Sequence, residues 1–109
     1  MTNETIKAII AFRDARDWAR FHTVANLAQS ISIESAELLE LFQWGNSPTR
    51  EAIADELADI AIYLNTLAHD IGINMESAVL SKLALNEKRY PVAKCKGRSD
   101  KYTEYQDEV

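Results

Sequence analysis

Two pairs of acidic residues recur at the same spacing in the middle of the chain. Glu34 and Glu37 are three residues apart, and the same step separates Glu56 from Asp59. Residues three apart on an α-helix lie on one side of it, so each pair directs two carboxylates the same way. Each pair also borders the apolar stripe of its own helix. Acids beside a core need an explanation, because burial and mutual repulsion both cost free energy.

A carboxylate cluster of this kind is typical of a site for a hard divalent cation. Mg²⁺ prefers oxygen ligands and keeps several waters, which leaves room for substrate phosphates in its coordination shell. Without a cation, two carboxylates about 4 Å apart repel each other by roughly 4 kcal/mol at an effective dielectric constant near 20. One acidic pair is common on a solvated helix face, but two such pairs favour a metal site. We expect Glu34, Glu37, Glu56 and Asp59 to hold Mg²⁺, with Mn²⁺ as a substitute.

The elements that must position these acids are helices. Hydrophobic periodicity predicts four of them, over residues 4–20, 24–44, 48–71 and 75–89. Ser47 is the expected N-cap of the third helix, with Pro48 at its first position. The short break before this helix favours an antiparallel pair with the second, which would bring the four carboxylates together. We expect an all-α fold, an antiparallel bundle of about four helices in residues 1–91, followed by a polar tail in residues 92–109.

Composition narrows the class of protein. The chain has 109 residues, 47% hydrophobic and 27% charged, with only three Gly and two Pro, which suits one helical globular domain. Its net charge of −5 argues against a nucleic-acid partner, because the surface repels polyanions. No apolar run approaches the roughly 18 residues of a membrane span, and the N-terminus has no leader pattern, so we expect a cytoplasmic protein without a membrane partner. Cys95 is the single cysteine, which excludes an intrachain disulfide and a cysteine-based zinc cluster.

Several stretches match a pattern that extends beyond the acids. They are RDWARFH (residues 16–22), Asn26-Leu27, LFQW (residues 41–44), ELADIAIYL (residues 56–64), SKLALNEKRYPV (residues 81–92) and KYT (residues 101–103). With the two acidic pairs and the eighteen residues between them, the chain resembles the all-α nucleoside triphosphate pyrophosphohydrolases of the MazG-like superfamily. It is most similar to their dCTP pyrophosphatase branch, and the resemblance spans nearly the whole chain.

The resemblance implies an enzyme that removes a nucleotide from the cellular pool. It would cleave a nucleoside triphosphate, dCTP or a modified dCTP, between the α and β phosphates to give the monophosphate and pyrophosphate. Mg²⁺ held by the four acids would neutralise the triphosphate and activate a water. Glu37 or Glu34 would act catalytically by orienting that water or taking its proton.

The resemblance also implies residues that bind the substrate. The aromatic group assigned to the base side consists of Trp18, Phe21, His22, Trp44 and Tyr63. Flat rings stack on a base, and a hydroxyl or an imidazole can read its edge. Lys82, Asn86 and Arg89 would reach the phosphates. Taken singly, core packing explains the aromatic residues and a solvated surface explains the cations, so the assignment depends on the family.

Two alternatives to this function differ from it in the substrate and in the class of protein. A pyrophosphohydrolase could act on another pyrophosphate compound, although the RDW and FQW aromatics argue against this. A noncatalytic helical interaction module would carry its acids only as a solvated face or an ion store. The superfamily assembles as dimers or as tetramers made of dimers, so the resemblance implies a homo-oligomer, a tetramer built from dimers, that completes the bundle. The tail would then either form a lid over the site or remain a free end.

Overall fold

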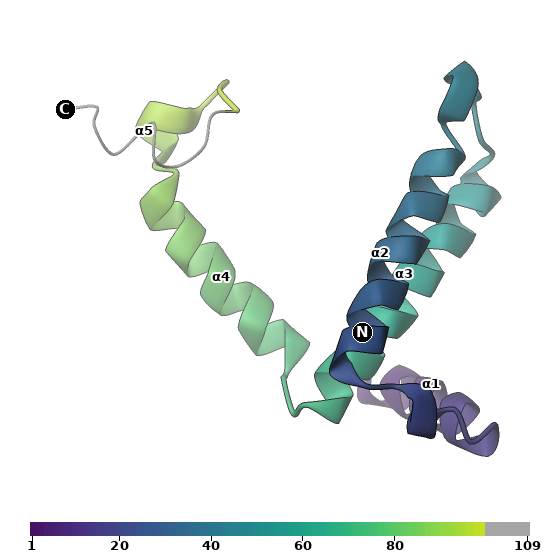
Figure 1. Cartoon of the computed structure of the whole chain (residues 1–109). Helices are drawn as coiled ribbons and strands as arrows, with labels where there is room; N and C mark the ends of the chain where they lie inside the picture. Colours follow the sequence, from purple (N-terminus) through teal and green to yellow (C-terminus); the bar gives the residue numbers. More distant parts are fainter. Residues whose placement is uncertain (100–109) are drawn as a thin grey trace. The chain divides into compact units, whose positions relative to one another are not determined.

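Helices account for all the regular structure in the part of the chain that the computed structural model describes, residues 1–99 (Figure 1). The α-helices are α1 (Asn3–Ala15), α2 (Val24–Glu40), α3 (Arg50–Asp70), α4 (Met75–Arg89) and α5 (Val92–Cys95), and two short 3₁₀ turns, η1 (Ala19–Phe21) and η2 (Gln43–Gly45), connect the first three. The all-α prediction is confirmed. Within these residues, none of the helices has the length and apolar character needed to cross a bilayer.

The pair formed by α2 and α3 is the largest helix contact (Figure 1). The two helices run antiparallel and lie side by side, joined through η2 at one end, as the short break in the sequence predicts. Leu27 on α2 is only 1% exposed and Ala68 on α3 is also buried, so the apolar contact is tightest toward the open end of the hairpin. The pairing places the acidic segments of both helices at the same level.

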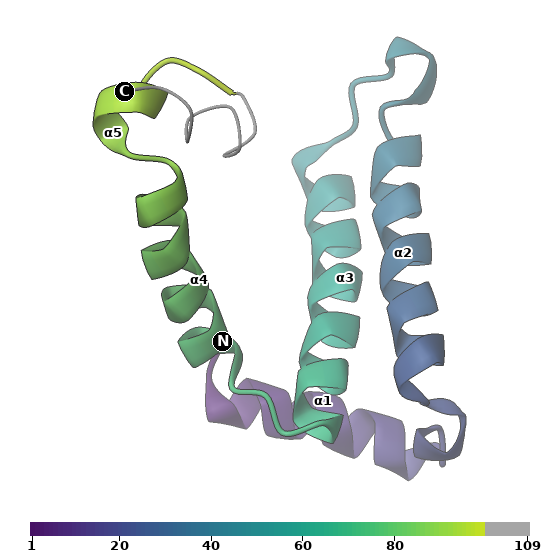
Figure 2. The ribbon, with the colours of Figure 1, turned by 60° about the vertical axis from the view of Figure 1, so that its left-hand side comes forward.

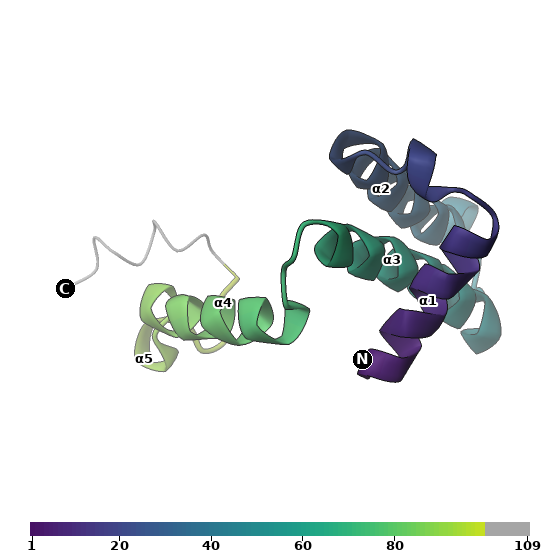
Figure 3. The same cartoon turned by 90° about the horizontal axis from the view of Figure 1, so that it is seen from below.

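Helix α1 crosses the open end of this hairpin, where α2 begins and α3 ends (Figure 2). The same crossing is visible from below in Figure 3. Ile6, Ile9 and Ile10 are half-buried, and Arg13 is the buried residue of the helix. The contact of α1 with α3 is much smaller than that of α2 with α3. A few side chains therefore determine how α1 sits.

The first helix is shorter than its periodicity predicts. It ends at Ala15 rather than near residue 20, and Asp17 adopts a left-handed conformation with φ of 55°. The backbone N–H of Trp18 then donates to the carbonyl oxygen of Arg13 at 3.2 Å. This is the hydrogen-bond arrangement of a helix terminated by a left-handed residue, a position that aspartate tolerates better than most residues. The RDW segment is therefore the end of a helix and a turn.

The start of the third helix also differs from the prediction. Thr49 is the N-cap of α3, and its hydroxyl oxygen accepts a hydrogen bond from the backbone N–H of Ala52 at 3.2 Å. Ser47 does not cap the helix, and Pro48 precedes the cap instead of occupying the first turn. Both Ser and Thr are good caps, so the sequence pattern alone could not choose between them.

The chain divides into two compact units, residues 1–73 and a second unit that begins at Asn74. The second unit contains α4, capped by the Asn74 side chain, and the four-residue α5. Helix α5 lies within residues 92–109, the segment predicted to be a polar tail, and the KYT motif lies outside the described residues. The domain boundary expected at residue 91 stays a prediction.

Candidate metal and nucleotide site

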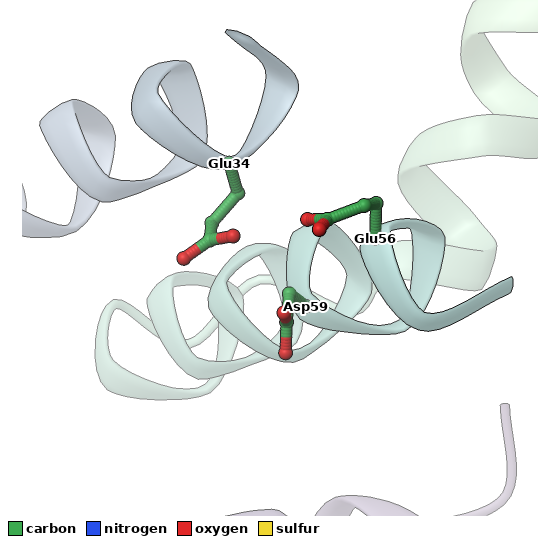
Figure 4. A group of neighbouring side chains, drawn as sticks. All are labelled: Glu34, Glu56 and Asp59. Atoms are coloured by element: carbon green, nitrogen blue, oxygen red, sulfur yellow. The ribbon is translucent and has the colours of Figure 1, made fainter. Parts of the chain in front are cut away.

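Three of the four predicted ligands come together between α2 and α3. Glu34, Glu56 and Asp59 each offer a carboxylate oxygen, and these three oxygens lie within 4.8 Å of one another. Glu34 extends from α2 and Glu56 from α3, so that their carboxylates point toward one another, with Asp59 one turn along α3 (Figure 4). Glu34 and Glu56 are half-buried and Asp59 is exposed. The site is thus open to solvent on the side of Asp59.

The fourth predicted ligand, Glu37, borders the same cluster. Burial, a hydrogen bond to Glu37 and the charges of Glu37, Asp59 and Glu56 together raise the pKa of Glu34 to about 7. Burial also raises the pKa of Glu56, with further contributions from the charges of Glu37 and Asp59 and a hydrogen bond to Glu37. The four acids therefore act on one another, and without a cation Glu34 is partly protonated near neutral pH.

Two oxygen atoms in the cluster are buried without a hydrogen-bond partner. They are the Oε2 atoms of Glu34 and Glu56, one from each helix. A buried oxygen without a donor costs free energy, and a divalent cation would coordinate both atoms and remove the repulsion between the carboxylates. Oxygen donors alone, with one side open to water, match the preferences of Mg²⁺ and Mn²⁺ rather than those of zinc. The residues present fit a hard divalent cation.

An aromatic pair lies one helical turn beyond the acids. The rings of His22 and Tyr63 meet edge to face with centroids 6.4 Å apart, and Tyr63 follows Asp59 by one turn of α3. The Nδ1 atom of His22 is buried and has no hydrogen-bond partner. Two predicted base-binding residues are thus brought together near the cluster, and one of them has an unsatisfied polar atom.

The turn that carries Phe21 and His22 is held by hydrogen bonds at the start of α2. Thr23 caps the helix by accepting from the backbone N–H of Asn26 at 3.1 Å. The side-chain amide of Asn26 donates back to the carbonyl oxygen of Phe21 at 2.9 Å. Sequence reasoning gave Asn26 no role, although a polar residue three positions after a cap is a signal for such a contact. Phe21 itself is exposed, with the guanidinium of Arg20 5.0 Å from its ring centroid.

Trp18 lies against a second aromatic residue on α1. Its ring meets that of Phe12 edge to face at 5.7 Å, and the guanidinium of Arg16 stacks 3.6 Å from the centre of the Phe12 ring. Trp18 itself remains partly exposed to solvent, with 44% of the residue accessible. The contacts of Phe12 with Trp18 and with Arg16 restrict the motion of these side chains. Trp18 is therefore held in place while part of its ring stays accessible.

Trp44 is not brought to this group of aromatic residues. It lies in η2, at the opposite end of α2 from His22, and the 17 residues of that helix span about 25 Å. It is 89% exposed and adopts a left-handed conformation with φ of 62°. One base cannot contact both Trp44 and His22 of the same chain. The sequence prediction grouped residues that a single chain holds apart.

The predicted phosphate-binding residues occupy α4 in the second unit. Lys82, Asn86 and Arg89 follow one another at steps of four and three, which places them on one side of that helix. Lys82 is exposed, whereas Asn86 and Arg89 are half-buried.

Comparisons with known proteins agree with this architecture. Residues 29–105 match the sequence model of the MazG-like family. The chain is 41% identical to dCTP pyrophosphatase 1 of Homo sapiens over 114 aligned residues, which cover 94% of this chain and 67% of the human protein. It is 40% identical to dCTP pyrophosphatase 1 of Bos taurus, with 94% and 68% of the two chains covered.

A solved structure shows the same fold. The crystal structure of a pyrophosphatase from Archaeoglobus fulgidus superimposes with a TM-score of 0.76 and 42% sequence identity, covering 81% of this chain and 90% of that protein. The match in sequence extends across both acidic segments, and the match in structure covers most of the helical part. From its sequence, its paired helices and their acidic cluster, we conclude that the chain belongs to the MazG-like family.

Proposed function

We propose that this protein is a Mg²⁺-dependent enzyme that hydrolyses dCTP or a modified dCTP to the monophosphate and pyrophosphate, and so cleans the nucleotide pool of the cytoplasm. It is a nucleoside triphosphate pyrophosphohydrolase, the class to which its dCTP pyrophosphatase relatives belong. One observation carries the metal part of the proposal. Glu34 and Glu56, on different helices, each have a buried carboxylate oxygen without a partner, and both residues cluster with Asp59.

All four acids of the cluster are proposed ligands, and one of them also activates the water. Glu34, Glu37, Glu56 and Asp59 would hold the cation, which when bound would offset the charge of the triphosphate and lower the pKa of a water. Glu37 lies beside both Glu34 and Glu56, as its effect on their pKa values indicates. Glu37 or Glu34 would orient the attacking water and accept its proton.

The base would bind next to the cluster, on the aromatic group at the open end of the hairpin. Tyr63 and His22 form its floor, and the unpaired Nδ1 of His22 offers a hydrogen bond to the edge of a base. Trp18 and Phe21 add exposed aromatic faces on which a base stacks. The nucleotide would then lie along α3, with its phosphates at the acids near Asp59 and its base one helical turn away at Tyr63.

Three residues of α4 are further candidates for binding phosphate oxygens. Lys82 and Arg89 supply positive charge and Asn86 supplies an amide, groups that bind phosphate oxygens. Of the segment predicted to form a lid, residues 92–109, the part from residue 100 onward lies outside the described residues.

We also propose that the active enzyme is a homo-oligomer, a tetramer built from dimers. Large apolar side chains are exposed on the hairpin, among them Ile33, Leu39, Leu57 and Ile62. Exposed apolar side chains of this size are often buried by association, and the commonest solution is a symmetric dimer. In such a dimer, the exposed Trp44 of one subunit would reach the base site of its neighbour.

The first experiment identifies the products. Purified protein and Mg²⁺ are incubated with each NTP and dNTP, including 5-methyl-dCTP, and the products are separated by anion exchange. We expect monophosphate and pyrophosphate, fastest for a deoxycytidine nucleotide. Glu56→Gln should lower kcat by about 10³-fold or more, because it removes a ligand beside the reacting phosphate.

Matched controls make this experiment specific. Glu40→Gln removes an exposed acid from the last residue of α2 and should leave kcat unchanged. Diphosphate plus phosphate would mean cleavage of the other anhydride bond and would contradict the mechanism. Turnover of a different pyrophosphate compound, with none of any nucleotide, would assign another substrate. Binding of Mg²⁺ without hydrolysis of any compound would indicate a noncatalytic module.

A further inference from the structure

The buried ion pair between α1 and α3 has no part in the site described so far. The Nη1 atom of Arg13 donates to both carboxylate oxygens of Asp70, at 2.8 Å and 2.7 Å, and its Nε donates to Asp14 at 3.1 Å. The Arg13 side chain is 10% exposed and that of Asp70 is 24% exposed. Arg13 is the one buried charged residue in the part of the chain that the structure describes.

The pair joins two helices whose other contacts are few. Arg13 lies near the end of α1 and Asp70 is the last residue of α3, 57 residues away in the chain. The apolar residues of α1 that face the hairpin are only half-buried. A charge-assisted contact with two short bonds is directional, whereas apolar contacts allow a helix to slide or rotate. The pair therefore fixes the angle and register of α1 on α3.

Arg13 is also the hydrogen-bond acceptor for Trp18. Its carbonyl oxygen receives the backbone N–H of Trp18 at 3.2 Å, across the left-handed Asp17. Asp70 of α3 is thus connected to Trp18 through the side chain of Arg13, its carbonyl oxygen and one turn. The same α3 carries Glu56, Asp59 and Tyr63. Any rotation of α1 would move Trp18 relative to these groups.

We propose that Arg13 and Asp70 are positioning residues, which set the direction of Trp18 relative to the acids and Tyr63 on α3. This inference rests on the proposed function in one respect, the role of Trp18 in binding the base. The pair touches neither substrate nor metal in the arrangement proposed above. Its effect on catalysis passes through Trp18 alone.

Steady-state kinetics separate positioning from chemistry. Asp70→Asn keeps the shape of the side chain and removes its charge, so we expect KM for the nucleotide to rise about tenfold, with kcat within about twofold of the wild type. The loss falls on KM because the base contacts are made equally in the ground and transition states. Arg13→Lys, made as a separate single variant, retains the charge of the pair and should keep most of the wild-type affinity. Lys7→Met, which removes an exposed charge from the same helix, is the matched control.

A spectroscopic measurement tests positioning without relying on activity. The chain has two tryptophans, so Trp44→Phe leaves Trp18 as the sole indole emitter. In that background, Asp70→Asn should increase the fast component of the fluorescence anisotropy decay of Trp18, whereas Arg13→Lys, as a separate single substitution, should change it much less. Both are measured well below the unfolding temperature, with circular dichroism to confirm that the helices are intact. Arg13→Gln, which removes the other charge of the pair, replaces Asp70→Asn if that variant fails to fold.

The two experiments give distinguishable failures. An unchanged anisotropy decay in folded Asp70→Asn, together with a wild-type KM, would overturn the proposal. A fall in kcat with an unchanged KM would also overturn it, because that pattern indicates a disturbed catalytic centre. If the wild type hydrolyses no nucleotide, the proposed function fails, and the anisotropy decay alone still decides whether the ion pair positions Trp18.

Discussion

Glu34 is the residue at which the acidic cluster most clearly destabilises the metal-free protein. Its pKa rises to about 7 because of burial and its acidic neighbours, and one of its oxygens has no hydrogen-bond partner. A protein that kept this arrangement without using it would lose stability for no gain. A bound cation removes the repulsion that destabilises the free cluster, and this relief adds to the free energy of ion binding.

The pH dependence of stability tests this account of Glu34. In the metal-free folded protein Glu34 keeps its proton up to about pH 7, whereas its ordinary pKa is 4.5. Between these values the folded state binds more protons than the unfolded state, so stability falls as pH rises and then levels off. Glu34→Gln should remove this component, with a melting temperature that exceeds that of the wild type by a few degrees above pH 7 and matches it near pH 4.5.

The measurement is a thermal melt in EDTA at several pH values, repeated with saturating Mg²⁺. With Mg²⁺ the order should reverse, because the wild type gains binding energy that Glu34→Gln has lost. Glu40→Gln, an exposed acid on the same helix, should follow the wild type in both conditions. A parallel pH dependence for wild type and Glu34→Gln would show that the cluster is well solvated and would argue against a metal site.

At the scale of the elements, the ends of the helices place the functional residues. The left-handed Asp17 ends α1 and directs the chain toward η1, and Thr23 restarts it as α2. The left-handed conformation of Asp17 costs about 1 kcal/mol, and the Thr23 cap stabilises α2 by about 1 kcal/mol. Together they carry Trp18 and His22 to the same end of the hairpin.

The N-terminus of α3 offers a matched pair of variants. Thr49→Ala removes the cap of the helix that carries Glu56 and Asp59, and should lower the free energy of unfolding by about 1 kcal/mol. Ser47→Ala changes a hydroxyl two residues earlier that does not cap the helix, and its effect should stay within about 0.5 kcal/mol. Urea denaturation followed by circular dichroism compares the two. Equal losses, or a larger loss for Ser47→Ala, would place the cap where the sequence pattern alone put it.

At the scale of the whole molecule, the position of Trp44 connects the site to assembly. A large side chain that is 89% exposed and held in a left-handed conformation gains nothing from its own chain. Such a conformation costs roughly 1–2 kcal/mol for a bulky residue, which contacts made elsewhere must offset. A neighbouring subunit supplies those contacts in the proposed oligomer, and the base site is then shared between two chains.

Mixing two variants that each weaken nucleotide binding tests the shared site, with activity compared at substrate concentrations well below KM. Trp18→Ala and Trp44→Ala each impair every site of their own oligomer. If Trp44 acts on the neighbouring subunit, a mixed dimer has one site with both tryptophans intact, so equal mixing and exchange should restore about a quarter of wild-type activity. Activity is measured after subunit exchange in mild urea, with size-exclusion light scattering to establish the oligomeric state. No recovery in exchanged oligomers, or a monomer at micromolar concentration, would contradict the shared site.

Local patterns in the sequence predicted the helices and the spacing of the acids. Apolar residues recur three or four positions apart along an amphipathic helix. This spacing can be recognised in the sequence, so α2 and α3 could be predicted without knowledge of what they contact. The two acidic pairs belong to the same periodicity, and the short break between the helices implied that they would meet. The sequence could not choose between Ser47 and Thr49 as the cap, because both residue types satisfy the same donors.

Only the tertiary structure decided which distant residues meet. Arg13 and Asp70 are 57 residues apart, and no local pattern distinguishes them from the other charges of their helices. The separation of Trp44 from His22 likewise depends on the length and direction of α2 in space, whereas the motifs in the sequence record only residue types in order. Periodicity is a property of one helix at a time. Distances between helices arise from packing, which couples all of them at once.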